Sequence, residues 1–340
     1  MRSIAFFLFI LVTGFNASLA ANETLTKVKT RGHLLCGVSD GLAGFSFRNA
    51  AGEWDGFDVD VCRAVAAAIF GVQGKPSVKF VSLTANNRFK ALSAGKVDVL
   101  SRNTTWTMGR DVELGLTFPV TVFYDGQGFM VPANLPITQV AHLSGARICV
   151  VAGTTHVANI PIHFNKRKMA HSLVTSTNQT ELRKMYQSGQ CEALSADRSA
   201  LFAIRSQLQD PSDHMILAGV ISKEPLGPVV REGDERWADI IRWTVYGLIN
   251  AEEKKIARLA MLDERGDALT SDQLNFLDVA GKLGAKLGLD AKWLRNAIAV
   301  VGNYGEIFER NVGTESELEI VRGKNALWSN HGLIYAPPMR

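Results

Sequence analysis

The sequence lacks the short motifs that mark several large classes of enzyme. It has no Walker phosphate-binding loop, no H-E-x-x-H metal motif and no G-x-S-x-G nucleophile turn. Its histidines offer no metal signal either, because the spacings between His156, His163 and His171 match no standard set of ligands. The sequence therefore predicts no metal site, no cofactor and no catalytic residue.

A surplus of charge of one sign is also missing. Lys and Arg number 37 against 33 Asp and Glu, which gives a formal net charge of +4 over 340 residues. The basic residues are scattered, and their one tight run, residues 166–168, is typical of a solvated loop. Nucleic-acid binding is therefore not predicted.

Long apolar runs are missing after residue 20. Before it, Arg2 precedes an apolar run over residues 4–15, and Ser18-Leu19-Ala20 offers small residues for cleavage. This run is too short for a bilayer, which takes about 20 residues. Residues 1–20 are therefore predicted to be a secretory signal peptide cut after Ala20. Because the residue directly after Ala20 is Ala21 and not a Cys, a lipid anchor is not predicted.

Residues 33–102 alternate between two apolar patterns. Strands are predicted at 33–38, 78–83 and 97–100 from their short apolar runs. Helical spacing connects Phe57 to Ile69, and Thr84 is the expected N-cap of a second helix that carries Phe89 and Leu92. Strands separated by helices indicate a parallel sheet with helical crossovers.

A similar series recurs further along the chain. Strands are predicted at 147–151, 172–175 and 191–195, with a helix at 180–188. The stretches 91–102 and 185–196 are alike, each with a helix end, a Gly C-cap, a strand and a polar loop. The α/β chain is therefore predicted to form two related lobes.

The rest of the chain has helical spacing, with helices predicted at 237–250, 272–287, 291–300 and 304–311. Lobe one is predicted to be discontinuous, residues 21–125 plus 228–340, and lobe two to be residues 126–227. The chain would cross between the lobes near 124–128 and again near 220–228.

Cysteine is scarce, with four residues in the chain. In an exported protein they indicate two disulfides, for which three pairings are possible. Cys36 lies on a predicted strand and Cys62 on the helix that packs over it. Cys149 and Cys191 lie on the first and third strands of lobe two, which are expected to be neighbours. The predicted pairs are therefore Cys36–Cys62 and Cys149–Cys191.

Ligands of open α/β sheets bind at the carboxyl ends of the strands. That rule selects residues 40–47, 102–110, 153–156 and 196–198. In them Arg110 can grip a carboxylate, and Thr154 and Thr155 stand at a helix start that favours an anion. Asp197 offers the opposite charge. This set suits a zwitterion, with its carboxylate at Arg110 and its ammonium at Asp197.

Each of these residues also has a plainer interpretation. Arg110 could form a surface ion pair with Asp111. Thr155 could simply cap its helix, and Asp197 could cap the helix that follows it. Residue spacing alone leaves these alternatives open.

Several stretches of the chain match a known family. The most specific is Arg-Asn-Thr-Thr-Trp-Thr at 102–107, and the others are residues 56–64, 87–89, 225–230, 301–308, 325–328 and 335–338. On these stretches the chain resembles the family 3 periplasmic solute-binding proteins, most closely the general L-amino-acid-binding proteins of bacterial ABC transporters.

The resemblance implies a type II periplasmic-binding-protein fold, with two parallel-core sheets joined by a two-strand hinge and a helical C-terminal extension. It also implies a periplasmic, cofactor-free monomer that delivers L-amino acids to a membrane permease. The alternative is a dehydratase of the cyclohexadienyl or arogenate type on the same fold. That enzyme would need a proton donor aimed at a leaving hydroxyl, and the four loops hold no acid other than Asp40 and Asp197.

The resemblance also implies roles for single residues. It gives the ligand carboxylate to Arg110 and the ligand ammonium to Asp197, and it matches Thr155 to a Thr at the helix start of the second lobe. Further contacts carried over are Asn103 and Thr105 in lobe one, with Leu42 and Arg88 in the side-chain pocket. Two departures bear on the ligand range. His156 stands where a smaller hydroxyl residue is expected, and Ser195-Ala196 replaces a pair of threonines.

Overall fold

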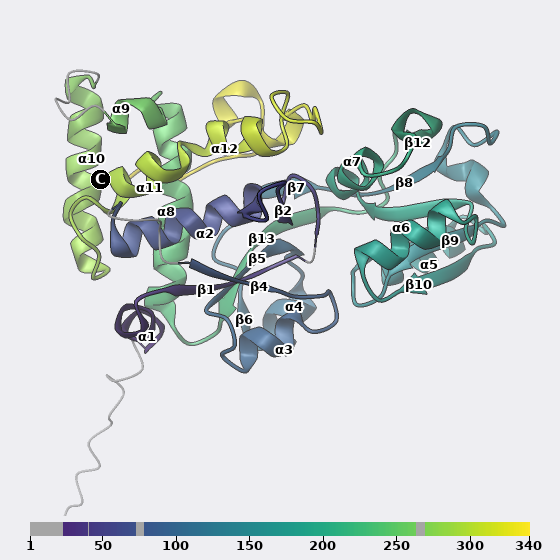
Figure 1. The fold of residues 1–340 in the computed structure, drawn as a ribbon, viewed down its shortest axis with the longest axis horizontal. Coiled ribbons are helices and arrows are strands. Elements are labelled where there is room, and N and C mark those ends of the chain that lie inside the picture. Colours follow the sequence, from purple (N-terminus) through teal and green to yellow (C-terminus); the bar gives the residue numbers. More distant parts are fainter. Residues whose placement is uncertain (1–22, 40, 73–77, 263–268) are drawn as a thin grey trace, which may run out of the picture.

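A computed structural model describes residues 23–39, 41–72, 78–262 and 269–340. The predicted signal peptide, residues 1–20, lies outside these ranges. Figure 1 shows the described chain as two lobes side by side, joined by extended strands. Over the same ranges, no helix has both the length and the apolar character that a membrane crossing requires.

The larger lobe is built on a six-stranded sheet with the order β4-β1-β5-β13-β6, to which β7 adds by pairing with β13. β1 is parallel to β4 and β5, as predicted, whereas β13 is antiparallel to its neighbours. The strands are β1 (Leu34–Val38), β4 (Val78–Ser82), β5 (Val99–Thr105), β6 (Leu116–Thr117), β7 (Phe123–Asp125) and β13 (Glu224–Arg231).

Two local predictions in this lobe are wrong. The helix expected to be capped by Thr84 is α3 (Arg88–Ser93), and its N-cap position is Asn87. The strand expected to end at residue 100 continues to Thr105, because antiparallel pairing with β13 extends it. The other elements here are α2 (Phe57–Phe70), β2 (Phe47–Arg48), β3 (Trp54–Asp55) and α4 (Met108–Glu113).

The smaller lobe has a five-stranded sheet with the order β10-β9-β11-β8-β12. Its parallel core of β9, β10 and β11 matches the predicted series, and β8 and β12 add antiparallel strands. The strands are β8 (Gln127–Pro132), β9 (Arg147–Val151), β10 (Ser172–Ser176), β11 (Ala193–Asp197) and β12 (His214–Ile216), and the helices are α5 (His156–Lys166), α6 (Gln179–Gln187) and α7 (Arg198–Ser206).

Two adjacent strands connect the lobes. β7 leads into β8 through Gly126, and the chain returns from β12 to β13. β7 and β13 pair in antiparallel register with Asp125 opposite Glu224. β13 belongs to the larger sheet from Glu224 onward, four residues before the lobe boundary predicted at residue 228.

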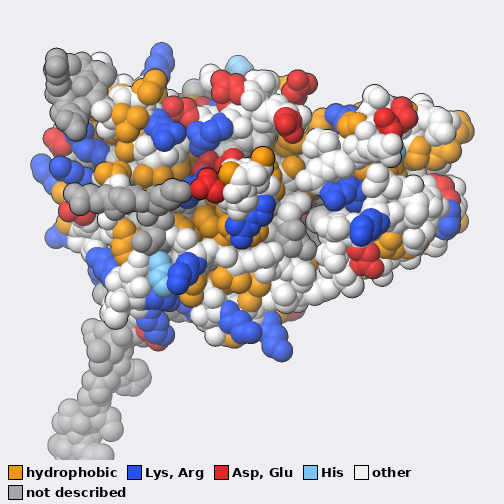
Figure 2. All heavy atoms as spheres, in the orientation of Figure 1, with side chains coloured by type: hydrophobic (Ala, Val, Ile, Leu, Met, Phe, Trp, Pro, Cys, Tyr) orange, Lys and Arg blue, Asp and Glu red, His pale blue; other side chains and the backbone are white. Residues whose placement is uncertain are grey.

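A helical layer covers the larger lobe, as predicted for the C-terminal part (Figure 1). α11 packs on α2, and the buried Trp237 indole donates to the Asp98 carbonyl. Capping boxes at Thr270 and Asn303 start α10 and α12. The helices are α1 (Glu23–Arg31), α8 (Glu235–Glu253), α9 (Arg258–Leu262), α10 (Ser271–Lys286), α11 (Trp293–Val301) and α12 (Tyr304–Asn311). On the face seen in Figure 2, Lys and Arg lie scattered over both lobes.

Both predicted disulfides are present, one in each lobe. Cys36 on β1 bonds to Cys62 on α2, and Cys149 on β9 bonds to Cys191 just before β11. The second bridge is reachable because β9 and β11 are neighbours. Each bridge therefore fastens a strand of the sheet core without joining the lobes.

We predict that the variant Cys149→Ser/Cys191→Ser is less stable than the parent. The bridge closes a loop with a sequence separation of 42, and a loop of this size restricts the unfolded chain by about 2–4 kcal/mol. Urea unfolding under oxidising conditions measures the loss. Parent protein in reductant, with both bridges open, is the comparison, and an unchanged free energy of unfolding in the variant would contradict the prediction.

Candidate ligand-binding cleft

A cleft lies where the carboxyl ends of β5 and β11 face each other across the two lobes. Eight of the nine residues predicted to bind ligand line it: Arg88, Asn103, Thr105 and Arg110 from the larger lobe, and Thr154, Thr155, His156 and Asp197 from the smaller. Leu42 is the exception. It is 2% exposed and packs in the hydrophobic core. Asp40 lies outside the described residues.

The lobes touch across this cleft. Gly153, with a φ of +76°, approaches Asn86 so closely that a Cβ on it would lie 2.2 Å from the Asn86 side-chain oxygen. Asn103 Nδ2 lies 3.5 Å from Asp197 Oδ2, which joins the ends of β5 and β11. The described arrangement is therefore one in which both lobes face the same small space.

Arg110 is held at the start of α4 with its guanidinium toward the cleft. Its Nη1 donates to the carbonyl of Thr105 at 2.8 Å. Asp111 instead accepts from the Trp106 indole at 3.1 Å, so the surface ion pair considered from the sequence is not formed. Burial lowers the pKa of Arg110, while the charges of Glu224 and Asp197 act in the opposite direction.

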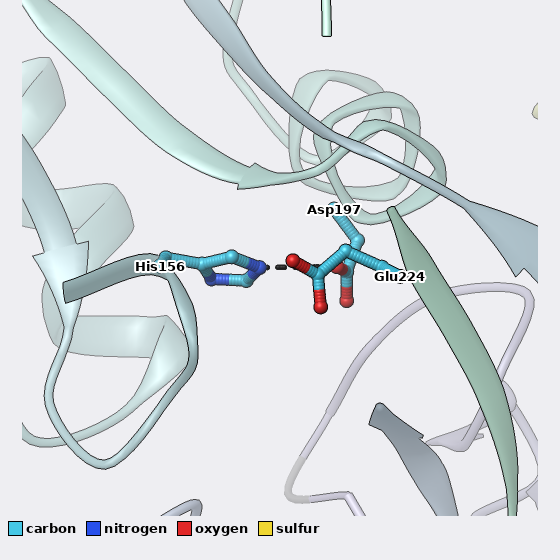
Figure 3. Close-up of side chains that lie close together, drawn as sticks. All are labelled: His156, Asp197 and Glu224. Atoms are coloured by element: carbon cyan, nitrogen blue, oxygen red, sulfur yellow. Dashed lines mark hydrogen bonds and ion pairs between the residues drawn. The ribbon is translucent and has the colours of Figure 1, made fainter. Parts of the chain in front are cut away.

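Asp197 is 3% exposed at the end of β11. Its Oδ1 lies 3.0 Å from His156 Nε2 (Figure 3). Although Asp197 is the N-cap residue of α7, its side chain makes no capping hydrogen bond. The capping role considered for it is therefore wrong, and the carboxylate faces the cleft instead.

Thr155 follows the same pattern at the start of α5. It occupies the N-cap position without a side-chain capping bond. Its hydroxyl donates to Glu224 Oε2 at 3.0 Å. Thr154 donates its hydroxyl to the Val151 carbonyl at 2.7 Å, which holds the turn before the helix.

Glu224 is a buried acid beside the cleft that the sequence analysis missed, as it missed Gln179 in the lining. Glu224 is 1% exposed and accepts three hydrogen bonds, from Thr155, from Asn159 Nδ2 at 2.9 Å and from Ser222 Oγ at 2.5 Å. Its one sequence signal is an acid directly before Pro225, at the predicted crossing between lobes. Figure 3 shows it beside His156 and Asp197.

These three side chains are also the group, within the described ranges, whose geometry approaches that of a metal site. One ligand atom of each lies within 4.8 Å of the others. Both oxygens of Glu224 are already engaged by neutral donors, and the Arg110 charge acts on both carboxylates. The cluster is thus satisfied by hydrogen bonds, and we assign no metal to it.

Arg88 is a buried cation that the cleft leaves unsatisfied. It is 3% exposed, and its Nε has no hydrogen-bond partner. Burial, followed by the charges of Arg102 and Arg110, lowers its pKa well below the ordinary value. Two buried acceptors beside it, Asn103 Oδ1 and Gln179 Oε1, are also without a partner. The cleft therefore presents a donor and two acceptors to whatever fills it.

Asn103 owes its position to Asp58, in the first turn of α2. Asn103 has a φ of +35°, a conformation that residues other than Gly rarely adopt. Asp58 accepts from its backbone N–H at 3.0 Å and from the Ser101 hydroxyl at 3.3 Å. Asp58 is 3% exposed, and burial raises its pKa to about 7.

The chain is similar in sequence to known solute-binding proteins. A family model described as bacterial extracellular solute-binding proteins, family 3, matches residues 34–253. The general L-amino acid-binding periplasmic protein AapJ of Rhizobium johnstonii is 47% identical over 97% of this chain and 96% of its own. The glutamate/glutamine/aspartate/asparagine-binding protein BztA of Rhodobacter capsulatus is 43% identical over 100% of both chains.

A solved structure is similarly close. A periplasmic binding protein of an ABC transporter from Brucella ovis, with glutathione bound, superposes with a TM-score of 0.89. It is 48% identical and covers 93% of this chain and 99% of its own.

We predict that Asp58→Asn flattens the pH dependence of stability between about pH 4 and pH 7. The pKa of Asp58 is raised from 3.8 to about 7 in the folded protein. The folded state then holds a proton that the unfolded state has lost, so its contribution to stability is present below pH 3.8 and disappears as the pH rises through 7. Urea unfolding at several pH values measures this. An identical slope in parent and variant would show that Asp58 is ionised throughout.

Proposed function

The chain belongs to the bacterial extracellular solute-binding proteins of family 3, and we propose that it binds free L-amino acids between its lobes and delivers them to an ABC transporter permease. Its lobes have the type II periplasmic-binding-protein fold. The proposed location is the periplasm, after cleavage of residues 1–20. One observation carries the proposal: opposite charges from the two lobes, Arg110 and Asp197, converge on one cleft.

Arg110 and Asp197 together form a clamp that holds the two ends of the ligand. The ligand carboxylate accepts from Arg110, whose half-buried guanidinium is partly desolvated. The ligand ammonium donates to Asp197, whose carboxylate is not spent on capping α7. A molecule that makes both contacts touches both lobes, so it favours the arrangement in which the lobes face each other.

The unsatisfied groups support a ligand with oxygen in its side chain. A buried guanidinium without an acceptor is costly, and Arg88 gains one from a side-chain carboxylate or amide. Three Arg side chains and one Asp line the cleft, which favours an acidic ligand over a basic one. BztA, by its name, binds glutamate, glutamine, aspartate and asparagine. We propose the same classes here, with glutathione as a second candidate, because the Brucella ovis relative was solved with it and its γ-glutamyl end carries the same zwitterion.

We propose that the protein binds its ligand without catalysing a reaction. A dehydratase needs an acid directed at a leaving hydroxyl. Among the described acids at or beside the cleft, Asp197 is engaged by His156, and Glu224 accepts hydrogen bonds from three donors. We therefore propose that the ligand is released unchanged, which mass spectrometry of the ligand recovered after incubation tests.

We predict that Arg110→Ala and Asp197→Ala each weaken binding at least about tenfold, for every amino acid bound. A charge-assisted hydrogen bond contributes about 1.5–3 kcal/mol, and its loss leaves the other charge buried. About 1.4 kcal/mol corresponds to a factor of ten. Calorimetric titration of ligand-stripped protein with the common L-amino acids and glutathione measures the effect. A folded Arg110→Ala that binds like the parent would remove it from the clamp.

We predict that Arg88→Met instead changes the order of preference. Methionine keeps much of the side-chain volume without the guanidinium, so affinity for acidic and amide amino acids falls about tenfold while that for apolar ones changes little. Arg63→Met is the matched control, since Arg63 bonds to Asp60 on α2 away from the cleft. An equal loss for all ligands would place Arg88 in the clamp rather than in the side-chain pocket.

A further inference from the structure

Each of the two strands that join the lobes carries an acid at the crossing. Asp125 ends β7, Glu224 begins β13, and the two residues stand directly opposite in antiparallel register. Two acids placed this way destabilise a strand pair when both are charged, and burial with the charge of Asp197 raises the pKa of Asp125 to about 7. Their presence therefore needs compensation from the bonds that each acid makes. We call Asp125 and Glu224 the hinge acids.

Asp125 accepts a hydrogen bond from the first turn of α7. Its Oδ2 accepts from the backbone N–H of Ser199 at 3.1 Å, and its Oδ1 accepts from Gly126 N at 2.8 Å. Ser199 is the second residue of α7, so its N–H is one of those that an N-cap side chain ordinarily satisfies. The N-cap residue itself, Asp197, makes no such bond.

Glu224 acts in a similar way at the start of α5. It accepts from the Thr155 hydroxyl at 3.0 Å and from Asn159 Nδ2 at 2.9 Å, one turn into the helix. Thr155, the N-cap residue, again makes no capping bond of its own. Two of the three helices that line the cleft in the smaller lobe, α5 and α7, are thus held at their first turn by an acid of the hinge.

We propose that the hinge acids are positioning residues, which hold the starts of α7 and α5 so that Asp197 is directed at the cleft rather than used to cap α7, and Thr155 is fixed at the cleft. Asp197 has two competing uses, to cap α7 or to face the cleft. Asp125 removes the first by occupying the Ser199 N–H. Glu224 fixes the Thr155 hydroxyl and the first turn of α5. This proposal rests on the proposed function, because it takes Asp197 and Thr155 as ligand-binding residues.

The placement of the hinge acids gives the arrangement a further consequence. Both stand on strands of the larger sheet, whereas both helix starts belong to the smaller lobe. Their hydrogen bonds therefore link the strand pair that joins the lobes to the groups that contact the ligand. Rotation at the hinge and orientation of Asp197 and Thr155 become dependent on each other.

The binding test compares Asp125→Ala with Asp125→Asn. Alanine leaves the Ser199 N–H to Asp197, so affinity for every amino acid falls about tenfold. Asparagine keeps an acceptor oxygen for that N–H and retains affinity within about threefold. In an Asp197→Ala background, Asp125→Ala causes no further loss, because the two residues act through one contact. Glu224→Ala is expected to lower affinity in the parent and to lose this effect in a Thr155→Ala background.

Asp98→Ala is the matched control. Asp98 is a buried acid, 3% exposed, that accepts from the Leu35 N–H and pairs with Arg31. A loss of affinity in Asp98→Ala as large as that in Asp125→Ala would mean that any buried acid has this effect, and would overturn the proposal. Equal losses in Asp125→Ala and Asp125→Asn would overturn it too.

Hydrogen exchange of the ligand-free protein tests the helix starts separately. Asp125→Ala should speed exchange of the Ser199 amide, and Glu224→Ala that of the amides of residues 157–160, with neither change in Asp98→Ala. If the parent bound none of the amino acids while this pattern held, the proposed function would fail and the hinge-acid contacts would stand. Unchanged exchange in both variants would overturn the proposal whatever the protein binds.

Discussion

The buried carboxylate of Asp197 sets a constraint on which much of the cleft depends. Taking an anion out of water costs several kcal/mol unless nearby groups compensate. Here the compensation comes from different parts of the chain: His156 from α5, Asn103 from the opposite lobe, and the charge of Arg110 from α4. Asn103 and Arg110 belong to the larger lobe, so they reach Asp197 only when the lobes face each other. The Asp197 carboxylate therefore interacts at once with the start of α5, the end of β5 and the Arg110 charge of the larger lobe.

The two sheets explain why these groups converge. Parallel strands end on one edge of a sheet, and each lobe turns that edge toward the other. β5 carries Asn103 and Thr105 to the edge, and Asp58 holds its last residues from α2. β11 carries Asp197 there, between the starts of α5 and α7. The helical layer packs on α2 at the other side of the larger lobe, so it supports the site without contributing to it.

The buried polar groups in and beside the cleft differ in whether the protein itself supplies their hydrogen-bond partners. Asp58 and Glu224 have several hydrogen-bond donors each and are satisfied within the protein. Arg88 Nε, Asn103 Oδ1 and Gln179 Oε1 are not satisfied. Folded proteins pair nearly all their buried polar groups. Unpaired atoms gathered at one cleft are therefore best explained by a ligand that supplies the missing partners.

The sequence by itself determined the two-lobed α/β plan, the helical C-terminal part and both cysteine pairings, because periodicity and strand ends are local properties of the chain. It also selected Arg110, Thr155 and Asp197 as candidate ligand-binding residues. It left open whether Thr155 and Asp197 cap their own helices, since a cap and a ligand contact need the same residue types at the same position. Only the tertiary structure decided this, by bringing Asp125 and Glu224 from the hinge to the two helix starts. It also decided that Leu42 belongs to the core and that Glu224 belongs beside His156 and Asp197. Contacts between residues far apart in the chain depend on how the lobes pack, and no local pattern encodes that.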